Sequence, residues 1–401
     1  MNNSLNMISL FSGAGGMDYG FEAAGFKTKV AVEFDHDCCE TLRTNRDWAV
    51  IEKDIHTVTS EEILETGGLA KGNVDLLIGG PPCQPFSKAG YWFKGGPKRL
   101  EDSRSDTLYA YMRCIRDTLP LVFVFENVHG INYSGKEEGF KLLQELAKEI
   151  NAEKGTNYNL SWKVINTADY GVPQIRKRLF IVAHREGLEF KFPEPTHFPI
   201  EVINSSLQFE EMLPYTTAWD AIGNLIPSEP IETLNMRGRW AELLPSIPEG
   251  ENYLWHTNRK GGLPLFGWRT RYWSFLLKLA KDKPSWTIQA QPGPSIGPFH
   301  WQNRILAKNE LAAIQTFPKG IHFFGSRQSV QKQIGNAVPS LIAEILGRAI
   351  IEQFFHNMYL PNNPTLAVPF LRPIPEAEEI SDVPDKFHHL LGEHPDYSAK
   401  T

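Results

Sequence analysis

Three short segments hold residues whose types could carry out nucleophilic and acid–base chemistry. The first, GGPPCQPFS (79–87), places Cys83 after two prolines and shortly before a third. Prolines fix their own φ and restrict the residue before them, so the backbone around this thiol is braced. A buried structural cysteine needs no such bracing. The segment is therefore typical of a thiolate nucleophile, and a helix beginning near Pro85 would favour the thiolate.

The other two segments supply an acid and two cations. Glu126, in FENV (125–128), ends an otherwise apolar stretch, where low dielectric raises a carboxyl pKa and suits a proton donor. Arg176 and Arg178, in PQIRKRLF (173–180), precede another apolar stretch. One of them could point to a site and the other to an acid. Taken singly, a capping acid and an exposed basic turn explain these residues as well.

A glycine-rich turn near the N-terminus predicts a ligand site. FSGAGGMDYG (11–20) follows an apolar stretch and has Gly13, Gly15 and Gly16, which permit a tight turn and close approach of a ligand. Exposed N–H groups at the start of the next helix favour an anionic group. The dinucleotide fingerprint fails because position 18 is aspartate. A ligand with a carboxylate is therefore favoured over a nicotinamide dinucleotide.

Two acids near predicted strand ends extend this site. Glu33 is placed to accept hydrogen bonds from ribose hydroxyls, and Asp54 could bind an adenine amino group. Either acid alone is more simply a solvated strand-end residue. With the glycine turn, the two acids indicate a nucleoside that carries an amino-acid tail. S-adenosyl-L-methionine is such a molecule, and it is the predicted cofactor; no metal is predicted.

These residues must be positioned by an alternation of strands and helices. That alternation predicts an α/β fold, a Rossmann-like and mostly parallel sheet with helices on both faces. We expect strands at 7–11, 29–35, 49–55, 74–80, 120–128, 162–167 and 178–183, and helices at 16–26, around 39–42, and at 139–150, 307–317 and 340–355.

The pattern changes near Phe192, where prolines cluster and periodicity weakens. We predict a first α/β domain over 1–190, which holds the candidate catalytic and cofactor residues, and a smaller irregular domain over 191–300. The domain over 191–300 is hereafter the recognition segment, because the family resemblance given below implies target recognition for it. The same resemblance implies that the C-terminal segment over 301–358 returns to the catalytic domain. Residues 359–401 are predicted to be an acidic, proline-rich tail. We expect that tail to be extended or partly disordered, a solvated linker by default.

Composition narrows the class of protein and of partner. The 401 residues carry a net charge of −6, yet Met236–Arg304 holds ten basic residues, four acidic ones and six of the ten tryptophans. A basic, aromatic segment is typical of nucleic-acid binding. Four cysteines without CxxC spacing make a zinc site or a disulfide framework improbable and favour a reducing, cytoplasmic location. The absence of a long apolar run predicts no membrane association.

Together these motifs resemble the DNA (cytosine-5-)-methyltransferase family, in its prokaryotic restriction–modification form. The similar segments follow the family order and span Ser9 to about Ile350. They are FSGAGG (11–16), the acids Glu33 and Asp54, GGPPCQPFS (79–87), ENV (126–128), DYGVPQIRKRLFIVA (169–183), RILAKNELAAIQTFP (304–318) and QIGNAVP (333–339).

The resemblance implies a role for each matching residue. Cys83 would add to C6 of a cytosine, Glu126 would contact N3 and the exocyclic amine, and Arg178 would bind the O2 side. Arg176 and Gln174 would support the site. The last helix and QIGNAVP would fold back to complete the cofactor site, whose positions would be Phe11, Gly13, Gly15, Gly16, Glu33, Asp54, Ile55, Pro82, Leu108 and Asn336.

The resemblance also implies double-stranded DNA as substrate, with the target base flipped out of the duplex. Candidate DNA contacts lie in the Cys83 loop and the recognition segment: Ser87, Arg104, Arg237, Arg239, Arg259, Lys260, Arg269 and Arg271. A monomer is expected. Whether a cognate restriction endonuclease acts separately beside it is left open.

Three alternatives remain at this point. An RNA (tRNA) cytosine-5 methyltransferase shares these motifs, although its recognition region is shorter. A nicotinamide oxidoreductase with an incidental cysteine is disfavoured by the missing third glycine. A non-catalytic DNA-binding relative is disfavoured because Cys83, Glu126 and Arg178 are all present.

Overall fold

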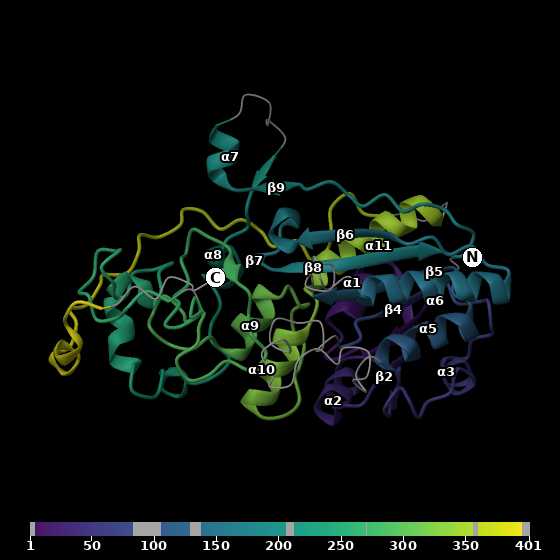
Figure 1. Ribbon diagram of the computed structural model, residues 1–401, viewed down its shortest axis with the longest axis horizontal. Helices are drawn as coiled ribbons and strands as arrows, with labels where there is room; N and C mark the ends of the chain where they lie inside the picture. Colours follow the sequence, from purple (N-terminus) through teal and green to yellow (C-terminus); the bar gives the residue numbers. More distant parts are fainter. Residues whose placement is uncertain are drawn as a thin grey trace.

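The computed structural model describes residues 5–82, 106–128, 138–205, 212–269, 271–355 and 360–394. Its centre is a seven-stranded sheet in the order β3-β2-β1-β4-β5-β8-β6 (Figure 1). Each neighbouring pair from β3 to β5 is parallel, whereas β8 runs antiparallel to both β5 and β6. The strands are β1 (Leu5–Leu10), β2 (Phe26–Glu33), β3 (Ala49–Glu52), β4 (Leu76–Gly79), β5 (Val122–Val128), β6 (Ser161–Asn166) and β8 (Lys177–His184).

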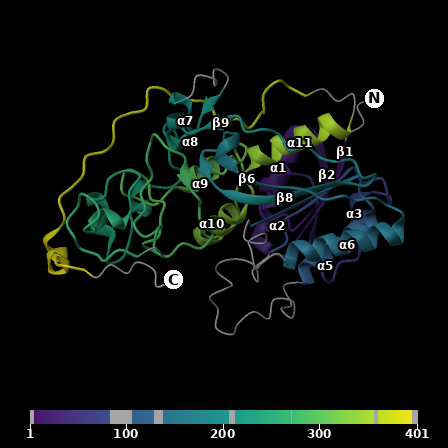
Figure 2. The ribbon, with the colours of Figure 1, turned by 45° about the horizontal axis from the view of Figure 1, so that its top comes forward.

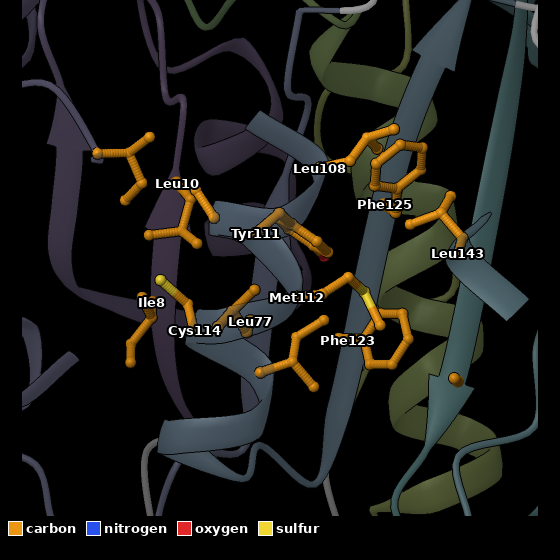
Figure 3. Close-up of a cluster of buried hydrophobic side chains, with 14 of the residues drawn as sticks. Ile8, Leu10, Leu77, Leu108, Tyr111, Met112, Cys114, Phe123, Phe125 and Leu143 are labelled. Carbon is orange, nitrogen blue, oxygen red and sulfur yellow. The ribbon is translucent and has the colours of Figure 1, made fainter. Parts of the chain in front are cut away.

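Helices cover both faces of this sheet, as the alternation predicted. Because neighbouring strand residues point to opposite faces, Leu77 packs into one core cluster while Leu76 and Ile78 pack into another. The first cluster lies under α3 (Ser60–Gly67), α5 (Asp106–Thr118) and α6 (Glu138–Lys154). Figure 3 shows its centre, with Tyr111 of α5 among Leu77, Phe123 and Phe125. The Rossmann-like α/β prediction is confirmed.

On the opposite face, the first and last helices of the domain pack together. They are α1 (Gly16–Ala24) and α11 (Ser340–Phe354). A Cβ at Gly20 would lie 2.2 Å from the Ser340 carbonyl oxygen, and one at Gly16 would lie 2.5 Å from that of Val338. Only glycine permits this close approach. The glycine-rich segment therefore also lets the C-terminal segment return to the N-terminal helix.

A third core cluster joins this domain to the later part of the chain. It combines Tyr19, Leu42 and Trp48 with Leu279 and Trp301. Its helices are α2 (His36–Asn45), α8 (Ala218–Ile222), α9 (Lys308–Ile314) and α10 (Arg327–Asn336). The sharp limits predicted for the domains at 190 and 300 remain a prediction, since this cluster draws on residues from both sides of each.

The recognition segment has little regular structure. It contains β9 (His197–Phe198), α7 (Ile200–Asn204), β10 (Leu213–Pro214), α8, β11 (Ser285–Trp286) and 3-10 turns at Ile231–Leu234, Ala241–Ser246 and Tyr253–His256. A fourth core cluster, here called the recognition core, holds it together. That cluster includes Met236, Leu244, Tyr253 and Leu276, and also Phe387 from the C-terminal tail.

The tail differs from the solvated linker that its composition suggested. Residues 360–394 are extended, with one 3-10 turn at Asp385–Leu390, but they are attached to the rest of the protein at several points along the path that Figure 2 shows in yellow. The reason is that buried acids and a lysine bind its backbone and side chains, and Phe387 packs in the recognition core.

One described stretch, Arg327–Phe354, is long and apolar enough to cross a membrane by length and mean hydropathy alone. Of the apolar 18-residue part of this stretch, 83% is buried inside the protein, as the core helix of a globular domain would be.

Candidate active site

The glycine turn and Glu33 form one hydrogen-bonded unit at the carboxyl edge of the sheet. Phe11 and Gly13 both have a φ of 54°, and that of Gly15 is 81°, so the chain turns sharply between β1 and α1. The Gly13 N–H donates to Glu33 Oε2 at 2.8 Å. Among described residues, nothing lies within 4 Å of a Cβ built at Gly13, so the turn faces open space.

Glu33 ends β2 as predicted, and its carboxylate accepts three backbone hydrogen bonds. Besides Gly13, the N–H groups of Phe34 and Asp35 donate to Glu33 Oε1, each at 2.9 Å. Burial raises the pKa of Glu33, and these N–H donors oppose that rise. The carboxylate is thus held in place beside the open turn, and its Oε2, which accepts one hydrogen bond, has a lone pair left for a hydroxyl group of a ligand.

The second predicted acid is placed differently. Strand β3 ends at Glu52, so Asp54 lies two residues beyond the strand rather than closing it. Its side chain is 62% exposed, and the N–H and Nδ1 of His56 lie 3.0 and 2.6 Å from its Oδ1. These hydrogen bonds lower the pKa of Asp54. Ile55, beside it, is buried in the first core cluster.

Phe34 is a candidate that the sequence did not single out. It follows Glu33 directly, and 67% of it is exposed although it is a large apolar residue. An exposed aromatic ring beside the predicted ribose acceptor, Glu33, is placed to stack on a planar base. The sequence could have revealed this candidate, because Phe34 directly follows the acid predicted to end the strand. A residue at that position lies at the carboxyl edge of the sheet, where the ligand is expected.

Glu126 and Arg178, the acid and the cation predicted to act in the reaction, form an ion pair. In the antiparallel pairing of β5 and β8, Val128 stands opposite Arg178, which makes Glu126 and Arg178 diagonal neighbours on one face. Arg178 Nε lies 3.1 Å from Glu126 Oε1, with side-chain exposures of 15% and 12%. Burial raises the pKa of Glu126, and Arg178 and then Arg176 oppose the rise. Burial likewise lowers the pKa of Arg178, against Glu126.

The start of the cysteine loop is fixed beside this pair. A Cβ at Gly80 would lie 3.0 Å from Glu126 Oε2, so any larger residue there would crowd the carboxylate. Asn127 Nδ2 donates to the Pro81 carbonyl at 2.9 Å, and Thr107 Oγ1 donates to the Pro82 carbonyl at 3.3 Å. Asn127 therefore links ENV to the proline pair, a role that the sequence did not reveal.

Cys83, Ser87 and Arg104 lie outside the described residues. The other three cysteines, Cys38, Cys39 and Cys114, are free and buried. Burial raises the pKa of each, to about 12 for Cys39. A raised pKa suppresses the thiolate, so these three are poor nucleophiles. Cys83 remains the candidate by elimination and by its position directly after Pro82.

Arg176 and Gln174 are buried links rather than open groups. Arg176 is 2% exposed, and its Nη2 donates to the Gly335 carbonyl at 2.8 Å. Burial lowers its pKa, and Arg178 acts in the same direction. Gln174 Nε2 donates to Gln315 Oε1 at 2.9 Å. These two hydrogen bonds join the segment PQIRKRLF (173–180), which includes strand β7 (Gln174–Ile175), to the end of α9 and to α10.

Three further predicted cofactor positions are distributed around this edge. Leu108 of α5 is 2% exposed and packs in the first core cluster, whereas Pro82 and Asn336 are exposed. Asn336 ends α10, next to the Gly335 carbonyl that Arg176 binds. The structure thus brings QIGNAVP to the motif that carries Arg178.

A cleft of about 680 Å³ opens at the start of α2, where Asp35 and Asp37 line it. Asp35 and Lys332, whose Oδ2 and Nζ are 2.7 Å apart, lie in its lining with the N-terminal turns of α10 and the segment 288–299. The cleft thus lies between the start of α2, α10 and the C-terminal part of the recognition segment.

The predicted DNA contacts of the recognition segment are all at the surface. Two guanidinium groups stack on tryptophans, Arg239 on Trp240 at 4.6 Å and Arg259 on Trp268 at 3.9 Å. Lys260 is paired with Glu251 at 2.6 Å. The exposed candidates are Arg237, Arg239, Arg259, Lys260, Arg269 and Arg271.

The tryptophans of the segment have different environments. Trp301 is buried at 3% exposure, but Trp273 and Trp286 are 55% and 51% exposed. Trp286 pairs with Ile175 across β11 and β7, which places an exposed ring beside the arginine motif. Exposed rings of this kind are candidates for stacking on bases.

A group of His36, Glu40 and Glu52 has ligand atoms within 4.8 Å of one another. Arg43 Nη1 binds both acids, at 2.7 and 2.6 Å, and the group lies at the surface. Because the arginine already balances the acids, this cluster is better explained as a surface ion-pair network.

The sheet order, with one antiparallel strand, and the ligand edge define a methyltransferase of the Rossmann-like class. Residues 5–352 match the family model of the C-5 cytosine-specific DNA methylases. The chain belongs to this family, and it is a DNA (cytosine-5-)-methyltransferase of the restriction–modification type.

Two curated relatives illustrate the similarity. Type II methyltransferase M.SacI of Streptomyces achromogenes is 39% identical over 376 residues, covering 88% of this chain and 94% of the relative. Type II methyltransferase M.AquIA of Picosynechococcus sp. is 46% identical over 237 residues, covering 58% of this chain and 93% of the relative.

Solved structures agree on the fold. A putative DNA modification methyltransferase encoded within a prophage of E. coli has a TM-score of 0.64 at 22% identity, covering 87% of this chain and 99% of that one. DNMT2 of Spodoptera frugiperda has a TM-score of 0.59 at 15% identity, covering 87% of this chain and 100% of that one.

Proposed function

We propose that this enzyme transfers a methyl group from S-adenosyl-L-methionine to C5 of a cytosine flipped out of a specific double-stranded DNA sequence. The reaction would proceed through a covalent bond between Cys83 and C6 of the base. The observation that carries the proposal is the Glu126–Arg178 pair, 3.1 Å apart, beside the start of the loop that leads to Cys83.

The cofactor is assigned to the edge formed by the glycine turn, Glu33 and Phe34. The open space at Gly13 suits a ligand in contact with the backbone, and Glu33 can accept from ribose hydroxyls. The exposed ring of Phe34 can stack on adenine. Bound there, S-adenosyl-L-methionine supplies an electrophilic methyl group on a sulfonium.

The protein's own residues would activate the base. C5 of cytosine is a weak nucleophile, and addition of the Cys83 thiolate to C6 converts the ring into an enamine that is reactive at C5. Negative charge then develops on N3 and O2. A protonated Glu126 would donate to N3, and Arg178 would stabilise O2. After methylation, a base removes the C5 proton; this base is water or another group. Loss of the proton expels Cys83 and restores the aromatic ring.

The target atom cannot be reached inside a duplex, so the base must be flipped out at a cost of a few kcal/mol. The recognition segment would hold the duplex during this step. Its exposed arginines can contact phosphates or guanine edges, and Trp273 and Trp286 can stack on bases. Arg239 and Arg259 are already oriented by their tryptophans.

We further infer that the enzyme acts as a monomer in the cytoplasm. Its relatives are Type II methyltransferases, so its biological role would be to protect host DNA from a cognate restriction endonuclease that acts separately.

The test is trapping on duplex DNA that contains 5-fluorocytosine. Fluorine at C5 cannot leave as a proton does, so the proposal expects a covalent adduct that depends on cofactor. Cys83→Ser should form no adduct and methylate no DNA, while its affinity for S-adenosyl-L-methionine stays within about twofold. Loss of cofactor affinity to the same degree would mean that Cys83 is structural. Parallel transfer of labelled methyl to tRNA alone would overturn the DNA assignment.

A further inference from the structure

The tail beyond α11 crosses from the catalytic sheet to the far end of the recognition segment. In Figures 1 and 2 the part from residue 360 onward is the yellow trace that runs along the outside of the molecule to the far end of the recognition segment. Residues 360–394 are called the strap below. Much of its middle part, Pro375–Asp382, is exposed, yet it is attached at several separate points.

The first attachment is to the catalytic domain. Glu344 lies in α11 with 0% exposure, and its side chain accepts hydrogen bonds from the strap. Its Oε1 accepts from the N–H of Thr365 at 2.5 Å and from Oγ1 of that residue at 3.1 Å. Its Oε2 accepts from the Leu366 N–H at 2.8 Å. A carboxylate buried in an apolar helix is costly unless such donors satisfy it.

The second attachment is at α8, where the recognition segment meets the third core cluster. Asp220 has a fully buried side chain, and its Oδ2 completes a capping box with Thr217. Its Oδ1 accepts from the Leu371 N–H and from Arg372 Nη1, both at 2.7 Å. The two oxygens of one carboxylate therefore join helix and strap.

The third attachment uses a buried lysine. Lys281 is 4% exposed, and its Nζ donates to Glu249 at 2.8 Å and, within the strap, to the Glu376 carbonyl at 2.8 Å and to Glu378 at 2.9 Å. The Glu378 N–H donates back to Glu249 at 2.8 Å. Glu249, Glu378 and one backbone carbonyl all bind the Lys281 ammonium, so the buried cation is not left uncompensated.

The last attachment is hydrophobic. Phe387 is 2% exposed and stacks on Trp240 at 5.7 Å with 13° between the rings. Val383 and Leu390 pack on the same recognition core, and Lys386 pairs with Glu242. The strap thus contributes a ring to the core that positions Arg239 and its neighbours.

We propose that the strap is a positioning element. It fixes the recognition core relative to the catalytic sheet, and it thereby determines how tightly and how selectively the enzyme engages duplex DNA. The inference rests on the proposed function, because it takes the recognition segment to be the part that binds DNA. A solvated tail would not place partners at Glu344, Asp220, Lys281 and Trp240 in succession.

The physical reason is geometric. The recognition core and the sheet have separate clusters of buried side chains, so their relative orientation depends on what connects them, which is the third core cluster and the strap. A displacement of about 1 Å at the reacting centre can cost on the order of 10²-fold in rate. The strap links the two clusters along a path independent of the main chain that enters and leaves the segment.

The experiment compares three variants in the full chain: Phe387→Ala, Phe387→Leu and Arg372→Ala. For each, KM for duplex DNA, KM for S-adenosyl-L-methionine, kcat, the rate ratio between cognate and single-mismatch duplexes, and the radius of gyration by small-angle X-ray scattering are measured. We expect Phe387→Ala to raise KM for DNA about tenfold, lower the mismatch ratio and expand the molecule, with KM for the cofactor unchanged. Phe387→Leu should restore most of the wild-type behaviour.

A purely structural role would instead reduce the active fraction and hence kcat, with both KM values and the mismatch ratio unchanged, and that result would overturn the proposal. If Phe387→Ala does not fold, Arg372→Ala decides, because it removes one partly exposed contact and should shift the same quantities less. No shift in that variant contradicts the proposal. Failure of wild-type protein to methylate duplex DNA would count against the proposed function instead, and the scattering comparison would still test the strap.

Discussion

Arg178 Nε lies 3.1 Å from Glu126 Oε1, although the two residues belong to different motifs on strands that run in opposite directions. The diagonal placement on one face of the sheet brings a carboxyl group with a raised pKa next to a guanidinium group, and both side chains are largely shielded from solvent. Such a pair can serve both ends of the charge that develops on a pyrimidine ring when a nucleophile adds to it.

Replacement of Glu126 tests this pair directly. Glu126→Ala removes the proton donor and leaves the buried cation of Arg178 without its carboxylate. We expect single-turnover methyl transfer to fall by on the order of 10²–10³-fold. Glu126→Gln, which keeps a hydrogen-bonding amide, should lose less. Unchanged rates in both variants would rule out a role for Glu126 in the reaction, and calorimetry with the cofactor checks that its site is intact.

The pH dependence of the reaction follows from the same residue. Burial raises the pKa of Glu126 above its ordinary 4.5, so its protonated form persists to higher pH than for an exposed glutamate. The donor is lost as pH rises through that raised value, and kcat/KM should decline on the alkaline side. Glu126→Gln cannot ionise, so its profile should lack this decline and retain only the rise that thiolate formation at Cys83 produces. A persistent alkaline decline in Glu126→Gln would assign it to another group.

Glu33 offers a test of the cofactor edge with a matched control. Glu33→Gln replaces the acceptor that holds Gly13 and would bind ribose hydroxyls. We expect the Kd for S-adenosyl-L-methionine to increase about tenfold or more, since hydrogen bonds to a charged group are worth about 1.5–3 kcal/mol. Glu52→Gln, at the end of the neighbouring strand and paired with His36 and Arg43 instead, should leave Kd nearly unchanged. If isothermal titration gave the same increase in Kd for both variants, the effect would come from the loss of a negative charge in general and not from a contact between Glu33 and the cofactor.

Asp18 makes stability depend on pH. It is 0% exposed in α1, neither oxygen meets hydrogen-bond geometry with the described residues, and burial raises its pKa to about 7. Ionisation therefore opposes folding, and the free energy of unfolding should fall as pH rises from about 4 to about 7. Asp18→Asn should remove this fall and gain up to about 4 kcal/mol above pH 7, with less gain at pH 5.

Urea unfolding at several pH values measures this difference. Asp47→Asn, at an exposed position, is the control and should change stability little at any pH. A gain in Asp18→Asn that does not vary with pH would contradict the assignment.

Gly20 tests the return of the C-terminal segment. Gly20→Ala places a methyl group 2.2 Å from the Ser340 carbonyl oxygen, so α11 must move away from α1. We expect a loss of about 1–3 kcal/mol in stability. The control is Gly293→Ala, where the nearest atom would be 3.5 Å from the new Cβ. Thermal unfolding of both variants measures the contrast, and equal stability would mean that the helices pack less tightly than described.

Much of the fold could be predicted from the sequence because strands and helices have distinct apolar periodicities. The strands expected at 120–128 and 178–183 correspond to β5 and β8, and the helix expected at 340–355 corresponds to α11. Helices α3, α5 and α10 were not predicted. In α10 the polar residues Gln331 and Lys332 weaken the apolar pattern, and burial against neighbouring segments supplies what local propensity does not.

For the site, the sequence by itself determined the chemistry and the tertiary structure decided the geometry. Cys83, Glu126 and Arg178 were recognisable from residue type and local context. Arg178 reaches Glu126 because it lies in β8 opposite Val128, whereas Arg176 precedes β8 and turns inward to the Gly335 carbonyl. Two residues apart on one continuous strand would share a face, so their different directions were decided by where β8 begins. The position of Asp54 beyond β3 was decided by where the strand pairing ends.

The tail shows the same division most clearly. Its acids and prolines determined that it would be extended, because prolines and a low apolar content prevent helices and an independent core. Only the folded structure could show where it lies, since its binding energy comes from partners far away in sequence. Buried Glu344, Asp220 and Lys281 need its hydrogen-bonding groups, and Trp240 needs its single buried ring.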